Sequence, residues 1–222
     1  MWDDEQGYDA EHDEDRVTTV AQLRGMYRQP SEIAGNKDRA RLDPASRQFI
    51  ESSRFMLLGT HGGVGSGDVS PRGGPSGFVL TLDDQHLAIA DLGGNNRLDS
   101  MSNILETGKV GLLFIVPGQG ETVRVNGDAW ITTSAQVLDR FQMPRRPKAA
   151  IVVRVETTFV HCAKSIYRGG LWDPEVWAEL ADTPDGAAIL VCQGAVDADL
   201  MGSRERLEQA YEDELSRERT PG

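Results

Sequence analysis

Short apolar runs, separated by glycine-rich or acidic turns, fill the middle of this 222-residue chain. Residues 121–133 and 149–159 alternate apolar and polar positions, which is typical of a strand with one buried face. Gly127 interrupts the first alternation and predicts a β-bulge or a close approach of backbone there. Four shorter runs also predict strands, at residues 55–60, 77–82, 86–90 and 110–116.

These runs predict a mainly β fold with peripheral helices. Residues 77–91 form a hairpin pattern, and only one firm helical pattern lies among the strands. A parallel sheet needs a helix after nearly every strand, and the sequence does not provide these helices. We therefore expect an antiparallel, closed barrel.

The other helical patterns lie before and after the strands. Residues 17–27 have Thr18 or Thr19 as a cap, and residues 31–39 are weakly helical. Asp43 and Pro44 mark the start of a firmer helix over 44–52, with Phe49 and Ile50 facing inward. Residues 174–181 and 203–215 predict helices near the C-terminus.

The helix among the strands is expected over residues 96–106. Its predicted buried stripe consists of four apolar residues, Leu98, Met101, Ile104 and Leu105. Gly108 follows as the residue that ends the helix.

The chain carries a formal net charge of −12, which argues against a nucleic-acid partner. Residues 1–16 hold five Asp and three Glu among few apolar residues, so we expect a disordered acidic tail there. We expect the folded domain over 17–174 and a helical extension over 175–222. No apolar run is long enough to span a bilayer, and the N-terminus is not a signal peptide, so a cytoplasmic protein is expected.

Two polar-basic clusters, each beside a strand pattern, are the main candidates for a site. They are Asp68-Val-Ser-Pro-Arg-Gly and Gly93-Gly-Asn-Asn-Arg-Leu-Asp-Ser. Arg72 and Arg97, with glycine backbone and a helix start beside them, suit a phosphate group. Two interpretations stay open for the second cluster, an anion site or a helix cap beside one surface arginine. Pro71 places the first cluster on an edge, at a bulge or at a strand end.

A third cluster covers residues 161–174, where the last strand should end. Lys164 and Arg168 are four residues apart, and Trp172 offers a flat face for an aromatic ring. Ligand contact and a plain basic loop with a half-buried tryptophan are both open. A buried, inert thiol is expected at Cys162.

No acid–base pair, catalytic motif or metal-ligand spacing stands out, so no catalytic residue or metal site is predicted. Contacts for a phosphate and a ring, without catalytic side chains, suggest that a cofactor carries the chemistry.

These motifs resemble those of the pyridoxamine 5′-phosphate oxidase-like superfamily of FMN-binding split barrels, and more narrowly those of a bacterial subgroup of FMN-dependent enzymes. The similarity runs from about Val17 to Pro174. Besides the two clusters it includes Val110-Gly-Leu-Leu-Phe-Ile-Val-Pro-Gly, Glu121-Thr-Val-Arg-Val-Asn-Gly and His161-Cys-Ala-Lys.

The resemblance implies a Greek-key-like split barrel and a homodimer with two FMN molecules at the interface. It implies hydride transfer between FMN and a small, unidentified substrate, with NADH or NADPH as a candidate donor. By the same resemblance the cofactor-binding residues are Ser70, Arg72, Gly73, Asn95, Asn96, Arg97, Ser100, Lys164, Arg168 and Trp172, the last three coming from the partner subunit.

The sequence also departs from the family pattern. Asparagines replace part of the basic phosphate clamp, and the C-terminal arginine-leucine-histidine-aspartate-arginine pattern of true pyridoxamine phosphate oxidases is missing. Oxidation of vitamin B6 is therefore not expected. Superfamily members also bind F420 or haem, so two alternatives remain, an F420-dependent reductase and a flavin-sequestering protein without turnover.

Overall fold

The computed structural model describes residues 13–195 and 204–220, and the chain divides into two units, residues 1–37 and 38–222. The first unit contains α1 (Val20–Met26) and the short α2 (Glu32–Gly35). Thr19 caps α1 by accepting from the backbone N–H of Gln22, as the sequence predicted. Most of the expected acidic tail lies outside the described residues.

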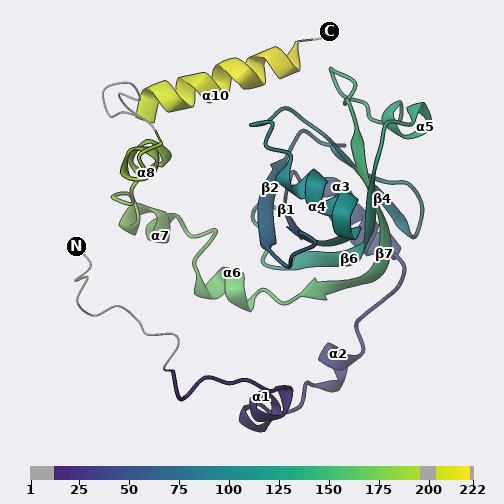
Figure 1. Ribbon diagram of the computed structural model, residues 1–222, viewed down its shortest axis with the longest axis vertical. Coiled ribbons are helices and arrows are strands. Elements are labelled where there is room, and N and C mark those ends of the chain that lie inside the picture. Colours follow the sequence, from purple (N-terminus) through teal and green to yellow (C-terminus); the bar gives the residue numbers. More distant parts are fainter. Residues whose placement is uncertain (1–12, 196–203, 221–222) are drawn as a thin grey trace. The chain divides into compact units, whose positions relative to one another are not determined.

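The second unit is built on one antiparallel sheet of seven strands (Figure 1). The strands are β1 (Phe55–His61), β2 (Gly67–Gly73), β3 (Val79–Thr81), β4 (His86–Ala90), β5 (Lys109–Ile115), β6 (Thr122–Thr132) and β7 (Ala150–His161). Their order is β2-β1-β5-β6-β7-β4-β3, so β2 and β3 are the two edges. The predicted antiparallel, mainly β fold is confirmed, with one strand more than the six or so expected. The edge strands β2 and β3 are not hydrogen-bonded to each other, so strand pairing does not close the barrel as expected.

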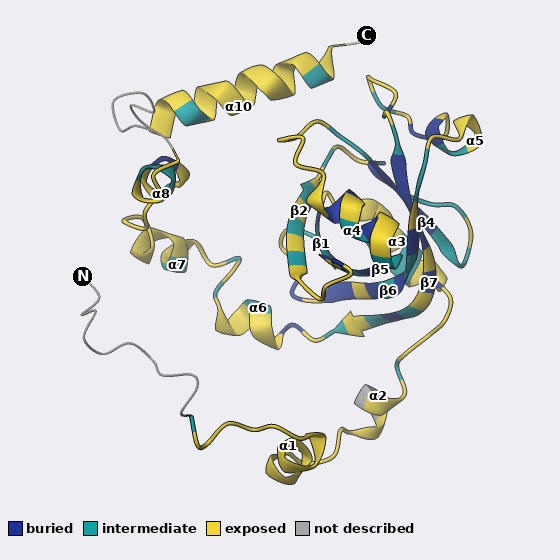
Figure 2. Cartoon of the chain, viewed as in Figure 1, coloured by how far each residue is buried: buried dark blue, intermediate teal, exposed yellow. Residues whose placement is uncertain are grey.

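The interior of the sheet holds the core (Figure 2). The alternating positions of β1, β5, β6 and β7 supply buried side chains such as Met56, Phe114, Val125 and Val153. A bulge lies between Asn126 and Gly127, where the register between the paired strands β6 and β7 shifts. A Cβ on Gly127 would overlap the carbonyl oxygen of Arg154, so the predicted bulge and the predicted close approach of backbone are both present.

β2 is a full edge strand of seven residues, paired with β1 alone. Pro71 lies opposite Leu57 on this edge, which is where a residue without an N–H is tolerated. Asp68 and Arg72 lie opposite Thr60 and Met56, so the polar residues of β2 extend the inner row of β1.

Two helices pack against the sheet, α3 (Pro44–Ser52) against β3 and β6, and α4 (Asp99–Thr107) against β1, β2 and β6. Asp43 caps α3 by accepting from the N–H groups of Ala45 and Ser46, and Ile50 is fully buried, as predicted.

The predicted start of the internal helix is wrong by three residues. Asn96 and Leu98 have φ of 57° and 61°, left-handed values that delay the helix until Asp99. Leu98 and Leu105 are exposed, which corrects two members of the predicted buried stripe, and the buried side of α4 is formed by Ser100, Met101 and Ile104. Gly108 ends the helix at φ 64°, as expected.

The remaining helices are α5 (Ala135–Leu138), α6 (Lys164–Arg168), α7 (Pro174–Glu179), α8 (Gly186–Cys192) and α10 (Arg204–Arg219). The helix predicted over 203–215 therefore runs on to Arg219. Cys162 is exposed, which corrects the expectation of a buried thiol. In the described part of the chain, no helix is long and apolar enough to cross a membrane.

Candidate anion-binding site

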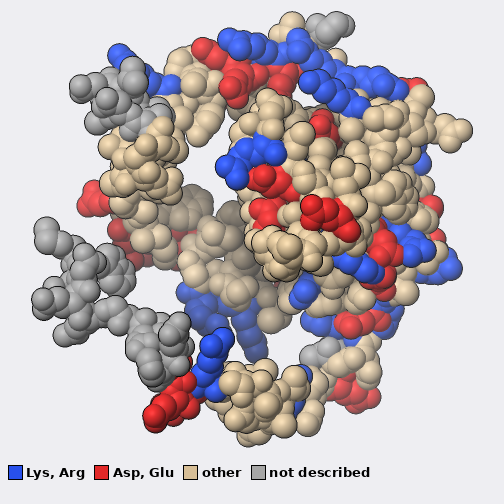
Figure 3. Space-filling view, in the orientation of Figure 1, with Lys and Arg blue, Asp and Glu red and all other residues tan. Residues whose placement is uncertain are grey.

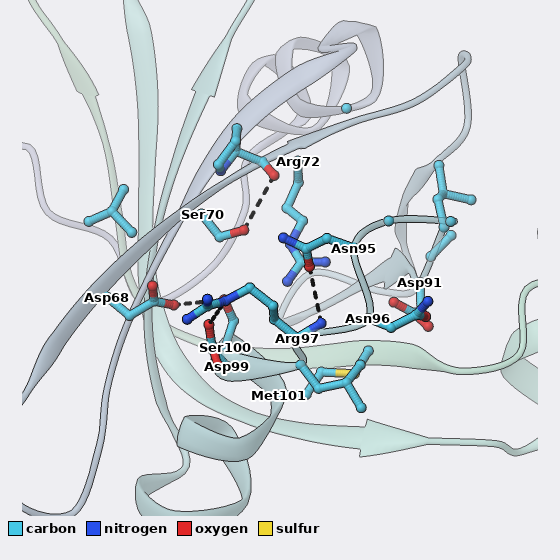
Figure 4. Close-up of a pocket in the computed structure, with 18 of the residues that line it drawn as sticks. Asp68, Ser70, Arg72, Asp91, Asn95, Asn96, Arg97, Asp99, Ser100 and Met101 are labelled. Atoms are coloured by element: carbon cyan, nitrogen blue, oxygen red, sulfur yellow. Dashed lines mark hydrogen bonds and ion pairs between the residues drawn. The ribbon is translucent and has the colours of Figure 1, made fainter. Parts of the chain in front are cut away.

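A cavity of about 420 Å³ lies between the edge strand β2 and the segment that joins β4 to α4 (Figure 4). This volume is in the range of small-molecule sites, roughly 300 to 1,000 Å³. Its lining consists of Asp68–Gly73, Phe78, Ala90–Asn96 and Arg97–Met101. The two polar-basic clusters, 20 residues and more apart in the sequence, thus face one space.

β2 contributes three polar side chains, those of Asp68, Ser70 and Arg72, which lie on one face because strand residues alternate. The Nε–H of Arg72 is buried and has no hydrogen-bond partner among the described residues. Leaving a buried donor unpaired costs about 1 to 3 kcal/mol, and more for a charged group. A bound ligand with an acceptor atom in this cavity would remove that cost by accepting the hydrogen bond.

The loop before α4, residues 93–98, lines the same cavity. The N–H of Arg97 donates to the side chain of Asn95 at 3.1 Å, and Asn96 and Leu98 turn the chain in left-handed conformations. No side chain caps the start of α4, so its first N–H groups keep their hydrogen-bonding capacity. Free N–H groups and the positive end of the helix dipole favour an anion.

Arg97 lies at the rim, with 72% of its side chain exposed. Its Nε donates to Oδ2 of Asp99 at 2.7 Å. This hydrogen bond, together with the charges of Asp99 and Asp68, raises the pKa of Arg97. The guanidinium is therefore charged, and its exposed position leaves it accessible to a ligand.

Three acids also line the cavity, Asp68, Asp91 and Asp99, although the sequence interpretation did not select them as site residues. Burial raises the pKa of Asp91, against the opposing pull of Arg72 and Lys148. Asp68 accepts a hydrogen bond from the hydroxyl of Ser100 at 2.9 Å. The alternation of Asp68 with Ser70 and Arg72 was the available signal for Asp68, whereas Asp91 carried none.

Of the predicted cofactor-binding residues, seven line the cavity: Ser70, Arg72, Gly73, Asn95, Asn96, Arg97 and Ser100. Lys164, Arg168 and Trp172 do not line it in this chain. They lie on α6 and in the turn after it, where the indole Nε1 of Trp172 donates to the carbonyl oxygen of Gln119 at 2.7 Å.

Charge on the described surface is mixed. On the face shown in Figure 3, acidic and basic side chains adjoin one another over the sheet. Lys109, Asp128, Arg154 and Glu156 form one such ion-pair network. Within residues 13–195 and 204–220, no three His, Cys, Asp or Glu residues form a group that could hold a metal ion.

The model of the pyridoxamine 5′-phosphate oxidase family matches residues 42–162, which is more than half of the chain. The chain therefore belongs to this family, and the sheet described above is its split barrel. No curated protein matches the sequence at a significant level.

Solved structures with a similar fold include HupZ from Group A Streptococcus, 18% identical over 54% of this chain and 93% of HupZ, with a TM-score of 0.42. An F420 reductase is 16% identical over 54% of this chain and 98% of its own, with a TM-score of 0.38. HutZ, a heme storage protein from Vibrio cholerae, is 13% identical over 55% and 94% of the two chains, with a TM-score of 0.36.

Proposed function

We propose that this protein is an FMN-dependent oxidoreductase and that the cavity beside β2 holds the phosphate end of FMN. The observation that carries the proposal is the buried, unpaired Nε–H of Arg72 in a cavity that also faces the uncapped start of α4. A phosphate oxygen would satisfy both kinds of donor. Family membership supports the same assignment.

In this proposal Arg72 and Arg97 bind the phosphate from two sides, and the backbone at Asn95 and Asn96 supplies further N–H donors. Ser70 and Gly73 lie on either side of Arg72 along β2, where the ribityl chain would pass. Bound FMN supplies the redox chemistry, which is hydride transfer to or from a small substrate. The chain's own residues bind the cofactor and orient it.

We further propose that the protein works as a homodimer in which Lys164, Arg168 and Trp172 of the partner subunit complete the ring pocket. In their own chain these residues do not line the cavity, so they are available to the cavity of a second copy. The outer face of β2, β1 and β5 supports self-association because it presents apolar residues side by side: Val69, Phe55, Leu57, Leu113 and Ile115. Val69 is 68% exposed and Phe55 40%.

A flavin-sequestering protein without turnover is the second candidate. It is favoured by the described lining of the cavity, which includes no histidine, cysteine, lysine or tyrosine and offers the carboxyl groups of Asp68, Asp91 and Asp99 as its acids and bases. Of the side chains that ligate haem iron, the described lining holds only Met101, so no histidine–iron bond is available at this position.

Cofactor titration tests the phosphate assignment. FMN, riboflavin, F420 and hemin would be added to purified protein, with wild type compared with Arg72→Gln and Arg97→Ala. We expect FMN to bind about 10- to 100-fold more tightly than riboflavin in wild type, since hydrogen bonds to charged groups are worth roughly 1.5 to 3 kcal/mol. Both variants should narrow that ratio and remain folded.

Arg146→Ala is the matched control, because Arg146 pairs with Asp139 on the surface and does not line the cavity. Equal affinity of wild type for FMN and riboflavin would count against the phosphate site. Tighter binding of F420 would redirect the proposal to a deazaflavin reductase. Anaerobic addition of NADH or NADPH to the FMN complex then separates the two candidates, since an oxidoreductase that uses either donor loses its flavin absorbance and a sequestering protein does not.

A further inference from the structure

Asp68 is a carboxylate on the wall of a cavity proposed to hold a phosphate. It lies on the same face of β2 as Ser70 and Arg72 and lines the cavity with them. A free carboxylate there would repel a bound anion, because like charges at short range disfavour one another. Its contacts indicate a different use.

One oxygen of Asp68, Oδ2, accepts two hydrogen bonds from buried hydroxyl groups. Ser100 of α4 donates from Oγ at 2.9 Å, and Thr60 of β1 donates from Oγ1 at 3.2 Å. Thr60 in turn accepts from Nδ2 of Asn103, also on α4, at 3.0 Å. Ser100 and Thr60 are only 3% and 7% exposed, so their hydroxyl groups depend on these partners.

The network attaches α4 to the sheet at two points one turn apart. Ser100 and Asn103 are neighbours on one side of the helix, since residues three apart share a face. Ser100 reaches Asp68 on β2, and Asn103 reaches Thr60 on β1. The position of the first turn of α4 relative to the edge strand is therefore set by these side chains.

The attachment leaves the start of the helix open. The hydroxyl of Ser100 is engaged with Asp68 and does not cap the backbone, and Leu98 at the cap position provides no side-chain acceptor. The first N–H groups of α4 therefore receive no side-chain cap, while the helix itself is held from the side. Ser100, predicted as a cofactor contact, thus has its hydroxyl proton committed to Asp68.

We propose that Asp68 is a positioning residue, which holds the helix start of α4 at the distance from Arg72 that an anion requires. The inference rests on the proposed phosphate site. Asp68 acts through Ser100 as a hydrogen-bond acceptor, and its negative charge is not needed for this. An amide oxygen in the same place can accept the same two hydroxyl groups.

Three single variants and one double variant test this: Asp68→Asn, Asp68→Ala, Ser100→Ala, and Asp68→Ala with Ser100→Ala. FMN dissociation constants would be measured by flavin fluorescence. Asp68→Ala and Ser100→Ala should each weaken binding about tenfold, and the double variant no more than either, because residues in one network are not additive. Asp68→Asn should bind as well as wild type or somewhat better.

Hydrogen exchange of the backbone N–H groups in the first two turns of α4 gives a readout that needs no cofactor. Exchange should accelerate in Asp68→Ala and Ser100→Ala and stay near wild type in Asp68→Asn. Ser46→Ala is the control, since Ser46 donates to the carboxylate of Asp43 at 2.6 Å on α3, outside the cavity. It should leave FMN affinity unchanged.

The inference is overturned if Asp68→Asn loses as much affinity as Asp68→Ala, or if the single effects add in the double variant. Should wild type bind no FMN, the proposed function fails and the exchange data still decide on Asp68. Unchanged exchange of α4 in Asp68→Ala would then reject the positioning role.

Discussion

The guanidinium of Arg97 donates from Nε to Oδ2 of Asp99, two residues later, at 2.7 Å (Figure 4). Both side chains are at least half exposed, so solvent screens the pair and it contributes little to stability. Asp99 therefore competes with a bound phosphate for Arg97 at little structural benefit.

Asp99→Asn should release Arg97 and remove a negative charge from the start of α4. We expect FMN to bind about three- to tenfold more tightly, with a loss of stability of at most about 1 kcal/mol from the acidic residue at the helix N-terminus. Fluorescence titration and urea denaturation measure the two effects. Asp139→Asn, which breaks the surface pair with Arg146, should leave FMN affinity unchanged. Weaker FMN binding in Asp99→Asn would mean that Asp99 holds Arg97 in its binding position.

Leu98 occupies a left-handed conformation although leucine is poorly suited to it. Asparagine tolerates this region and can cap a helix, so Leu98→Asn should raise the free energy of unfolding by about 0.5 to 1 kcal/mol. Leu105→Asn, at a position within α4 that is 76% exposed against 54% for Leu98, should lower it by about 0.5 kcal/mol through helix propensity. Urea denaturation of both variants tests the difference, and a loss at both positions would show that Leu98 is not strained.

A comparison of α3 and α4 shows why the sequence predicted the start of one helix and missed the start of the other. α3 was predicted to the residue because Asp43 and Pro44 determine its start locally. The start of α4 depends on Asn96 and Leu98, and for leucine no local rule predicts a left-handed conformation. The proximity of β2 to this loop arises from long-range pairing, β2 with β1 and β4 with β7, so the shared cavity was a hypothesis until the fold was known.

Gly127 was identified from the sequence as a bulge or close approach, and its surroundings make a sharp test. A methyl group there would overlap the backbone carbonyl of Arg154 on β7, which cannot move without breaking the longest strand pair. Gly127→Ala should cost about 2 to 4 kcal/mol in unfolding free energy or prevent folding. Gly67→Ala, at a position with nothing within 4 Å of the added carbon, should stay within about 1 kcal/mol of wild type. Similar stabilities of the two variants would contradict the close approach.

Asp91 should give the cavity a pH-dependent effect on stability. Burial raises its pKa above the ordinary 3.8, against the pull of Arg72 and Lys148. A raised folded-state pKa contributes stability that is complete below 3.8 and is lost as the pH rises through the folded value. The free energy of unfolding of Asp91→Asn should therefore increase relative to that of wild type as the pH rises from about 4 to 7. Denaturation at several pH values measures this difference.

Asp43 serves as a control, because its carboxyl group should change the pH dependence of stability in the opposite direction from Asp91. The side-chain hydrogen bond from Ser46 lowers the pKa of Asp43, so its contribution is present above 3.8 and lost as the pH falls through the folded value. Asp43→Asn should lose stability relative to wild type as the pH rises. If the stabilities of the two variants relative to wild type changed in the same direction with pH, burial would not raise the pKa of Asp91 as described.

Val69 tests whether the outer face of β2, β1 and β5 joins two copies of the chain. Its side chain lies on the opposite face of β2 from Arg72 and is 68% exposed in the single chain, beside Gly59 of β1. A homodimer should have a mass of about twice 24.3 kDa by light scattering. Val69→Arg should shift the protein toward the single-chain mass, because an interface core does not accept an unpaired charge. Val64→Arg, at a fully exposed position in the loop between β1 and β2, should not.

If FMN affinity falls together with the mass, residues of the partner subunit contribute to the site. A monomeric wild type that binds FMN fully would remove the need for those partner residues.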